Sequence, residues 1–128
     1  MKDFTPNMKS EAITVVNSTN TAVAAGSGSL PVFGTPMMIA LMEEATCNAV
    51  APLLDEGETT VGTKISVTHD KASSTGTTIT AFAELVEVDG RKLVFSVSAK
   101  DDKGDIIGKG TIERFVVISE KFMKRVNG

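Results

Sequence analysis

The sequence GTPMMIALMEEATCNAVAP spans Gly34–Pro52 and decides the fold of this chain. Its interior consists of Met, Ile, Leu and Ala with few charges, which predicts a helix that other elements cover on nearly all sides. We expect Thr35 to be the N-cap, because its hydroxyl can accept a hydrogen bond from a free first-turn N–H. Pro36 then takes the first helical position, where its missing N–H costs nothing. Pro52 predicts an end near Ala51, since a residue that precedes proline avoids the α region.

One carboxylate interrupts the apolar surface of this helix. At about 100° per residue, the neighbours of Glu43 on the helix surface are Ile39, Ala40, Cys47 and Val50, all of them apolar. A carboxylate in such surroundings is costly unless it is paired, hydrogen-bonded or protonated. Glu43 is therefore either an edge residue with a structural hydrogen bond or a solvated head group, or a functional acid.

Length and composition restrict the class of protein. The 128 residues, with 41% hydrophobic and 23% charged side chains, predict a single globular domain over residues 1–128. The net charge of −3 and the scattered Lys and Arg argue against a nucleic-acid partner. Without a long apolar run or a signal-like start, we expect no membrane partner and a cytoplasmic location. The single Cys47 argues against a disulfide framework and a cysteine-rich zinc site, so no metal is expected.

Alternating apolar residues predict strands on both sides of the helix. The predicted strands cover 12–16, 61–69, 77–88, 92–100 and 105–118. A change of parity at Val86 indicates a bulge, and Asp89-Gly90 is a strong hairpin turn signal. Residues 17–33 are rich in small and polar side chains and predict a lid-like loop. We expect 1–10 and 123–128 to be loosely ordered.

These elements predict an α+β fold. An antiparallel sheet with one apolar face must be covered, and the chain offers one apolar helix to cover it. The predicted architecture is the hotdog fold, in which a curved antiparallel sheet wraps around one central helix. Unpaired strand edges and an open helix end predict a homodimer, or a larger assembly, that is joined at the sheet edges.

Three chemically capable side chains converge in this arrangement. His69 shares the parity of the apolar residues in its strand, so we expect it to face the helix that carries Thr35 and Glu43. A neutral His beside a buried Glu forms an acid–base pair whose titration is shared. The Thr35 hydroxyl and the free N–H groups of the helix start can bind a developing negative charge. The alternatives are a structural or exposed His69 and a Thr35 that only caps the helix.

Two further residues are candidates for binding. Gly62 either marks a bulge or lets a ligand approach the backbone of its strand. Arg114 interrupts the apolar parity of the last strand. It either marks the point where that strand leaves the core or binds an anion, because the planar guanidinium fork matches a phosphate.

Several short motifs connect the chain to a known family. They are LMEEA at 41–45, VGT at 61–63, VTH at 67–69, DGR at 89–91, GTIER at 110–114 and EKF at 120–122. From about Val32 to the C-terminus, the sequence resembles the hotdog thioesterases typified by fluoroacetyl-CoA thioesterase. The resemblance implies that Thr35, Glu43 and His69 are the catalytic residues.

The same resemblance implies binding roles. Gly62 matches a glycine that contacts the substrate, and Arg114 matches an arginine that helps to hold coenzyme A. Relatives carry phenylalanines in the lid segment before the helix, and the phenylalanine at the end of this segment here is Phe33. We therefore expect Phe33 to contact the substrate.

The predicted activity is hydrolysis of an acyl-CoA thioester without a cofactor, since coenzyme A enters as part of the substrate. Glu43 would attack the carbonyl or activate a water, because a thiolate is a good leaving group. One alternative is a hotdog hydratase or dehydratase. Another is a protein that binds acyl-CoA or a small apolar ligand without turnover, although a passive pocket gains little from a buried carboxylate.

Overall fold

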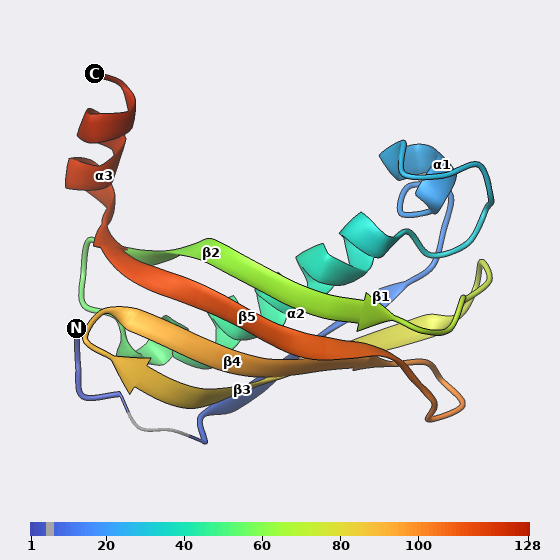
Figure 1. Ribbon diagram of the computed structural model, residues 1–128, viewed down its shortest axis with the longest axis horizontal. Helices are drawn as coiled ribbons and strands as arrows, with labels where there is room; N and C mark the ends of the chain where they lie inside the picture. The colour runs from blue at the N-terminus through green and yellow to red at the C-terminus, as the bar shows by residue number, and fades with distance from the viewer. Residues whose placement is uncertain (5–6) are drawn as a thin grey trace.

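Five antiparallel strands curl around one long helix (Figure 1). The computed structural model describes residues 1–4 and 7–128. In chain order the elements are β1 Lys9–Val15, α1 Ala22–Ala25, α2 Thr35–Val50, the 3-10 helix η1 Ala51–Leu53, β2 Glu58–His69, β3 Thr78–Asp89, β4 Lys92–Lys100, β5 Ile106–Ile118 and α3 Ser119–Val126. The predicted order of elements is confirmed for the central helix and for all five strands.

The sheet has the strand order β1-β3-β4-β5-β2, and all neighbouring strands are antiparallel. β1 and β2 are therefore its edges. The register of β3 with β4 shifts between Leu85 and Glu87, which confirms the predicted bulge at Val86. The β3–β4 hairpin closes around Gly90, whose φ of 62° lies in the left-handed region that glycine tolerates. A curved sheet around a central helix is the predicted α+β architecture.

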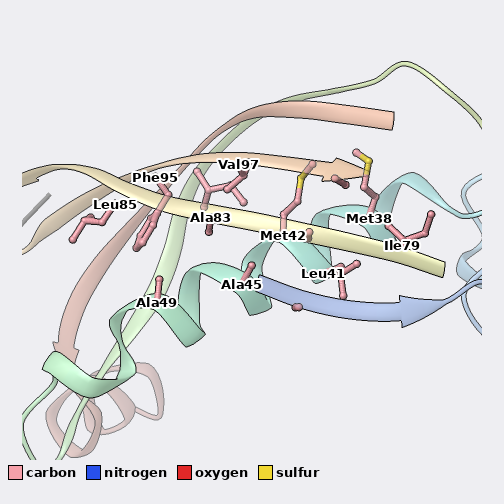
Figure 2. Close-up of a cluster of buried hydrophobic side chains, with 14 of the residues drawn as sticks. Met38, Leu41, Met42, Ala45, Ala49, Ile79, Ala83, Leu85, Phe95 and Val97 are labelled. Carbon is pink, nitrogen blue, oxygen red and sulfur yellow. The ribbon is translucent and has the colours of Figure 1, made fainter. Parts of the chain in front are cut away.

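The hydrophobic core lies between α2 and the concave face of the sheet (Figure 2). From α2 it takes Met38, Leu41, Met42, Ala45 and Ala49, and from the strands Ile79, Ala83, Leu85, Phe95 and Val97. The opposite side of α2 is open, because Ala40, Glu44 and Asn48 are exposed. The expectation that the helix is covered on nearly all sides is therefore wrong within one chain, since a single sheet covers only one side.

The start of α2 differs from the prediction. Gly34 is the N-cap, with an extended backbone and no side-chain capping bond, and Thr35 is already helical. The expectation that Thr35 caps the helix is wrong, because the chain turns into the helix one residue earlier. This leaves the Thr35 hydroxyl free to bind a residue outside α2.

The N-terminal segment is more ordered than expected. β1 begins at Lys9, within the segment 1–10 that was predicted to be loose, and pairs with β3. The backbone N–H of Lys2 donates to the Leu53 carbonyl at 3.0 Å. Residues 5–6 of that segment lie outside the described residues. The predicted lid 17–33 contains the short helix α1, which the Thr21 hydroxyl caps by accepting from the backbone N–H of Ala24.

The C-terminal segment forms α3 instead of a loose tail. Glu120 in its first turn and the basic residues of its last turn complement the helix dipole. Nevertheless, none of its side chains is buried, and Figure 1 shows α3 projecting from the end of β5. Within the described ranges, no helix combines the length and the hydropathy of a membrane span.

We predict that replacing Met42 by Ala destabilises the protein by about 3 kcal/mol, because this fully buried side chain leaves a cavity in the core. The matched control is Met123→Ala on α3, where the side chain is 48% exposed and the expected change is below about 0.5 kcal/mol. Urea denaturation of the two variants measures the difference. Equal losses of stability would show that the core is not the layer between α2 and the sheet.

Candidate active site

A bulge in β2 turns two predicted site residues toward α2. Gly62 and His69 are seven residues apart, so in a regular strand they would lie on opposite faces of the sheet. The register shift between Gly62 and Lys64 inserts one residue, which reverses the alternation. As a result Gly62 pairs with Arg114 and His69 pairs with Gly108, two positions on the same face of β5.

An ion pair joins α2 to the sheet. Arg114 Nη1 donates to Glu43 Oε2 at 3.0 Å, while its Nε donates to Thr60 Oγ1 at 2.9 Å and its Nη2 to the Thr60 carbonyl at 3.1 Å. Arg114 is 6% exposed, and a buried cation needs such partners to offset its lost hydration. The Glu43 side chain is 35% exposed, and its Oε1 has no hydrogen-bond partner in the described part of the chain. The pair thus orients a carboxylate with one free oxygen.

Thr60 was not predicted as a site residue. It lies two residues before Gly62 on β2, and so on the same face of the strand. The spacing of two residues predicts from the sequence that Thr60 and Gly62 share a face. Threonine is so common in strands, however, that this spacing alone does not indicate a contact with Arg114. Its hydroxyl and carbonyl fix the guanidinium of Arg114.

Gly62 lies directly beside the Glu43 carboxylate. A Cβ atom at this position would lie 2.9 Å from Glu43 Oε2 and 3.4 Å from Arg114 Nη1. The absence of a side chain is therefore required by the close approach of these groups, not by the backbone angles. Both sequence interpretations of Gly62 are compatible with the structure, since it adjoins a bulge and leaves the backbone open to a ligand.

A second pair lies at the start of α2. Thr35 Oγ1 and His69 Nδ1 are 2.8 Å apart and share a hydrogen bond. His69 Nε2 is buried and has no partner among the described residues. Burial lowers the pKa of His69, against weaker opposing effects of a hydrogen bond to the Lys71 backbone and of the Asp70 charge. The imidazole is therefore neutral at neutral pH, with one nitrogen available to a ligand.

A cavity of about 250 Å³ adjoins this second pair. It is lined by Ala22, Ser27, Val32, Phe33, Thr35, His69, Asp70, Lys71 and Ala72. Phe33 is 2% exposed, so it forms a packed wall of the cavity and not a mobile lid side chain. Lys71 is held by Asp101 at 2.7 Å and Asp105 at 2.6 Å, which raise its pKa to about 12.

The predicted site residues form two separate clusters. One cluster joins Thr35 to His69, and the other joins Glu43 to Gly62 and Arg114. Eight residues of helix separate Thr35 from Glu43, about 12 Å at 1.5 Å per residue. Gly62 and His69 pair with Arg114 and Gly108, which are six residues of strand apart, about 20 Å. The expected contact of Glu43 with His69 is therefore not formed within one chain.

The position of Arg114 changes its expected role. The resemblance implied a grip on coenzyme A, but the guanidinium lies inside the protein and donates to Glu43 and Thr60. Reaching a phosphate would require it to abandon these partners. In residues 1–4 and 7–128, no group of three or more His, Cys, Asp or Glu side chains is arranged to hold a metal ion.

Comparisons with known proteins agree on one family. The family model of the fluoroacetyl-CoA-specific thioesterase FlK matches residues 16–120. A fluoroacetyl-CoA thioesterase from Streptantibioticus cattleyicolor is 50% identical over 95 residues, which cover 74% of this chain and 68% of the relative.

Solved structures have the same fold. The fluoroacetyl-CoA thioesterase FlK superposes with a TM-score of 0.92 at 38% identity, covering 98% of this chain and 97% of FlK. A mutant of FlK in complex with fluoroacetate and CoA gives a TM-score of 0.86 at 40% identity, covering 93% of this chain and 99% of that one. A thioesterase superfamily member from Thermus thermophilus, at 24% identity, has a TM-score of 0.91 and supports the fold alone; it covers 99% of this chain and 93% of the relative.

We predict that His69 titrates below its ordinary pKa of 6.5, because burial disfavours the imidazolium. As the pH falls through 6.5, the unfolded chain binds the proton first, so the free energy of unfolding decreases toward acid pH. His69 is the chain's single histidine, so the C2–H resonance in a proton NMR titration reports it directly. In a His69→Asn variant this part of the pH dependence of stability should vanish. A pKa at or above 6.5 would contradict the burial.

Proposed function

Because the chain belongs to the family of the fluoroacetyl-CoA-specific thioesterase, a family of thioester hydrolases with the hotdog fold, we propose that Glu43 carries its reaction. The substrate is an acyl-CoA thioester, and the products are the free acid and CoA. The observation that carries the proposal is the Glu43 carboxylate, which Arg114 holds at 3.0 Å beside the open backbone of Gly62. We also propose a cytoplasmic location for the reaction, with which an acyl-CoA substrate is consistent.

Glu43 Oε1 is the reacting atom in this proposal. It either attacks the thioester carbonyl to form an anhydride, which water then hydrolyses, or removes a proton from the attacking water. In both routes one water is consumed, the C–S bond is replaced by a C–O bond, and the sulfur leaves as a thiolate that takes up a proton. Arg114 is a positioning residue, since its contacts fix the orientation of the carboxylate.

The other cluster supplies hydrogen bonds and the proton. His69 is neutral and its Nε2 has no partner in the described part of the chain, so this atom is free to bind the substrate or the leaving sulfur. Thr35 fixes the ring through Nδ1. Thr35 is at the start of α2, so the positive end of the helix dipole lies beside this pair and favours a developing negative charge.

A homodimer brings the two clusters together. Within one chain they lie too far apart to act on one carbonyl group, as the spacings along α2 and β2 show. β2 is an edge strand, with exposed residues from Gly62 to Ser66, so its backbone can pair with a second copy. In an antiparallel pair about a two-fold axis, the Gly62 end of one β2 lies beside the His69 end of the other. Each complete site then combines Glu43 of one subunit with the partner's His69.

The activity test is thiol release from a panel of acyl-CoAs that includes acetyl-CoA and fluoroacetyl-CoA. We expect hydrolysis by the native protein and a loss of at least about 100-fold in kcat for Glu43→Gln, which keeps the size but removes the reacting carboxylate. Gly62→Ala would place a Cβ 2.9 Å from Glu43 Oε2 and 3.4 Å from Arg114 Nη1, so we expect it to lower kcat by displacing the carboxylate.

The outcomes of this assay are distinct. Unchanged activity in Glu43→Gln would make Glu43 structural and overturn the mechanism. Saturable binding of acyl-CoA without thiol release would identify a binding protein. Hydration of an enoyl-CoA without thiol release would identify a hydratase.

The shared site is tested by mixing two inactive variants, Glu43→Gln and His69→Ala, after dissociation and reassembly. A mixed dimer has one site with both native residues, because Glu43 comes from one subunit and His69 from the other. Equal mixing makes half of the dimers mixed, so we expect recovery of about a quarter of the native activity. Each variant treated alone is the control. No recovery in a mixture shown to contain mixed dimers would place the complete site within one chain.

A further inference from the structure

We propose that Thr60 is a positioning residue of the reaction, because it limits the pairing of Arg114 with Glu43 to a single hydrogen bond. The second carboxylate oxygen, Oε1, thereby stays free to react. The inference rests on the proposed function, since it concerns the carboxylate that carries that reaction. Thr60 lies on β2 and is 8% exposed, and it acts on Glu43 through the guanidinium of Arg114.

Thr60 presents two oxygen atoms to one edge of this guanidinium. Its hydroxyl oxygen Oγ1 accepts a hydrogen bond from Arg114 Nε at 2.9 Å, and its carbonyl oxygen accepts one from Arg114 Nη2 at 3.1 Å. The guanidinium is a planar fork whose paired N–H groups match the two oxygens of a carboxylate. Thr60 therefore fills this fork as a carboxylate would, but with two uncharged groups.

Glu43 is left with a different nitrogen of Arg114. Nη1 donates to Glu43 Oε2 at 3.0 Å, and this is the single hydrogen bond between the two side chains. Pairs of Arg with a carboxylate are frequently bidentate, and a bidentate pair would occupy both carboxylate oxygens. The observed arrangement keeps the positive charge beside the carboxylate and leaves Oε1 for the thioester carbonyl or for a water.

Burial makes the Thr60 hydroxyl the group that maintains this arrangement. Arg114 is 6% exposed, so its donors depend on protein partners. Without the hydroxyl, Nε loses its acceptor, and the guanidinium is free to turn toward the carboxylate that Nη1 already binds. The Glu43 side chain is 35% exposed, so its carboxylate can turn to meet a second donor. The expected result is a bidentate pair in which Oε1 is no longer free.

The test compares Thr60→Val, which resembles threonine in shape but has no hydroxyl, with Thr60→Ser, which keeps the hydroxyl. Both are assayed by thiol release from the acyl-CoA that the native protein hydrolyses best. We expect Thr60→Val to lower kcat about tenfold or more at a nearly unchanged KM, because the carboxylate is displaced and the substrate contacts remain. Thr60→Ser should stay within about twofold of the native kcat, because its hydroxyl can accept the same hydrogen bond.

The matched control is Thr59→Val on the same strand. Thr59 is exposed and lies on the opposite face of β2, so we expect this variant to keep the native kcat and KM. An unchanged kcat in Thr60→Val would overturn the role of Thr60 and leave the proposed function intact. An equal loss in Thr60→Ser would also overturn it, because the hydroxyl would not be the group that matters.

A double variant separates positioning from a general loss of structure. In a Glu43→Gln background the reacting carboxylate is absent, so adding Thr60→Val should lower the residual kcat by less than about twofold. A further loss of about tenfold in this background would show that the hydroxyl acts independently of Glu43, which contradicts the proposal.

A crystal structure of Thr60→Val tests the contact itself, even if no thioester is cleaved. We expect both carboxylate oxygens of Glu43 to accept hydrogen bonds from Arg114. A retained single hydrogen bond with Oε1 free would overturn the proposal. If valine prevents folding, Thr60→Ala removes the same hydroxyl without adding bulk. It is assayed and crystallised in the same way, with the same expected fall in kcat and the same contradicting outcomes.

Discussion

The ion pair between Arg114 and Glu43 is the constraint on which the rest of the site depends. A guanidinium that is 6% exposed must have its charge and its donors satisfied, and here Glu43 on α2 and Thr60 on β2 satisfy them. These contacts of Arg114 on β5 fix the position of α2 relative to β2 and β5. The contact that satisfies this buried cation also orients a carboxylate whose second oxygen, Oε1, has no partner among the described residues.

The bulge in β2 brings a second part of the site onto the face of the sheet that carries Arg114. One inserted residue between Gly62 and Lys64 lets Gly62 and His69 face the same side of the sheet. Without this bulge, Gly62 and His69 would lie on opposite faces of the sheet, and only one of them could face α2. The bulge lies on an edge strand, where an irregular register interrupts only one ladder of hydrogen bonds.

The Thr35–His69 cluster and the Glu43–Gly62–Arg114 cluster are separate within one chain, and both lie next to surfaces that one chain leaves uncovered. α2 covers the sheet with one face only, and β2 is unpaired on its outer side. The proposed site across a two-fold axis would couple activity to assembly, because Glu43 on α2 and His69 on β2 belong to separate clusters within a single subunit.

The sequence by itself determined the central helix, the five strands, the bulge at Val86 and the chemical types at the site, because each of these follows from a local period or a local turn signal. It also identified the family through short motifs around Glu43 and His69. Only the tertiary structure decided that Arg114 is buried against Glu43 and that Thr35 binds His69 instead of capping α2, because these contacts join residues 71 and 34 positions apart. Such contacts depend on the register between strands and helix, which no local pattern encodes.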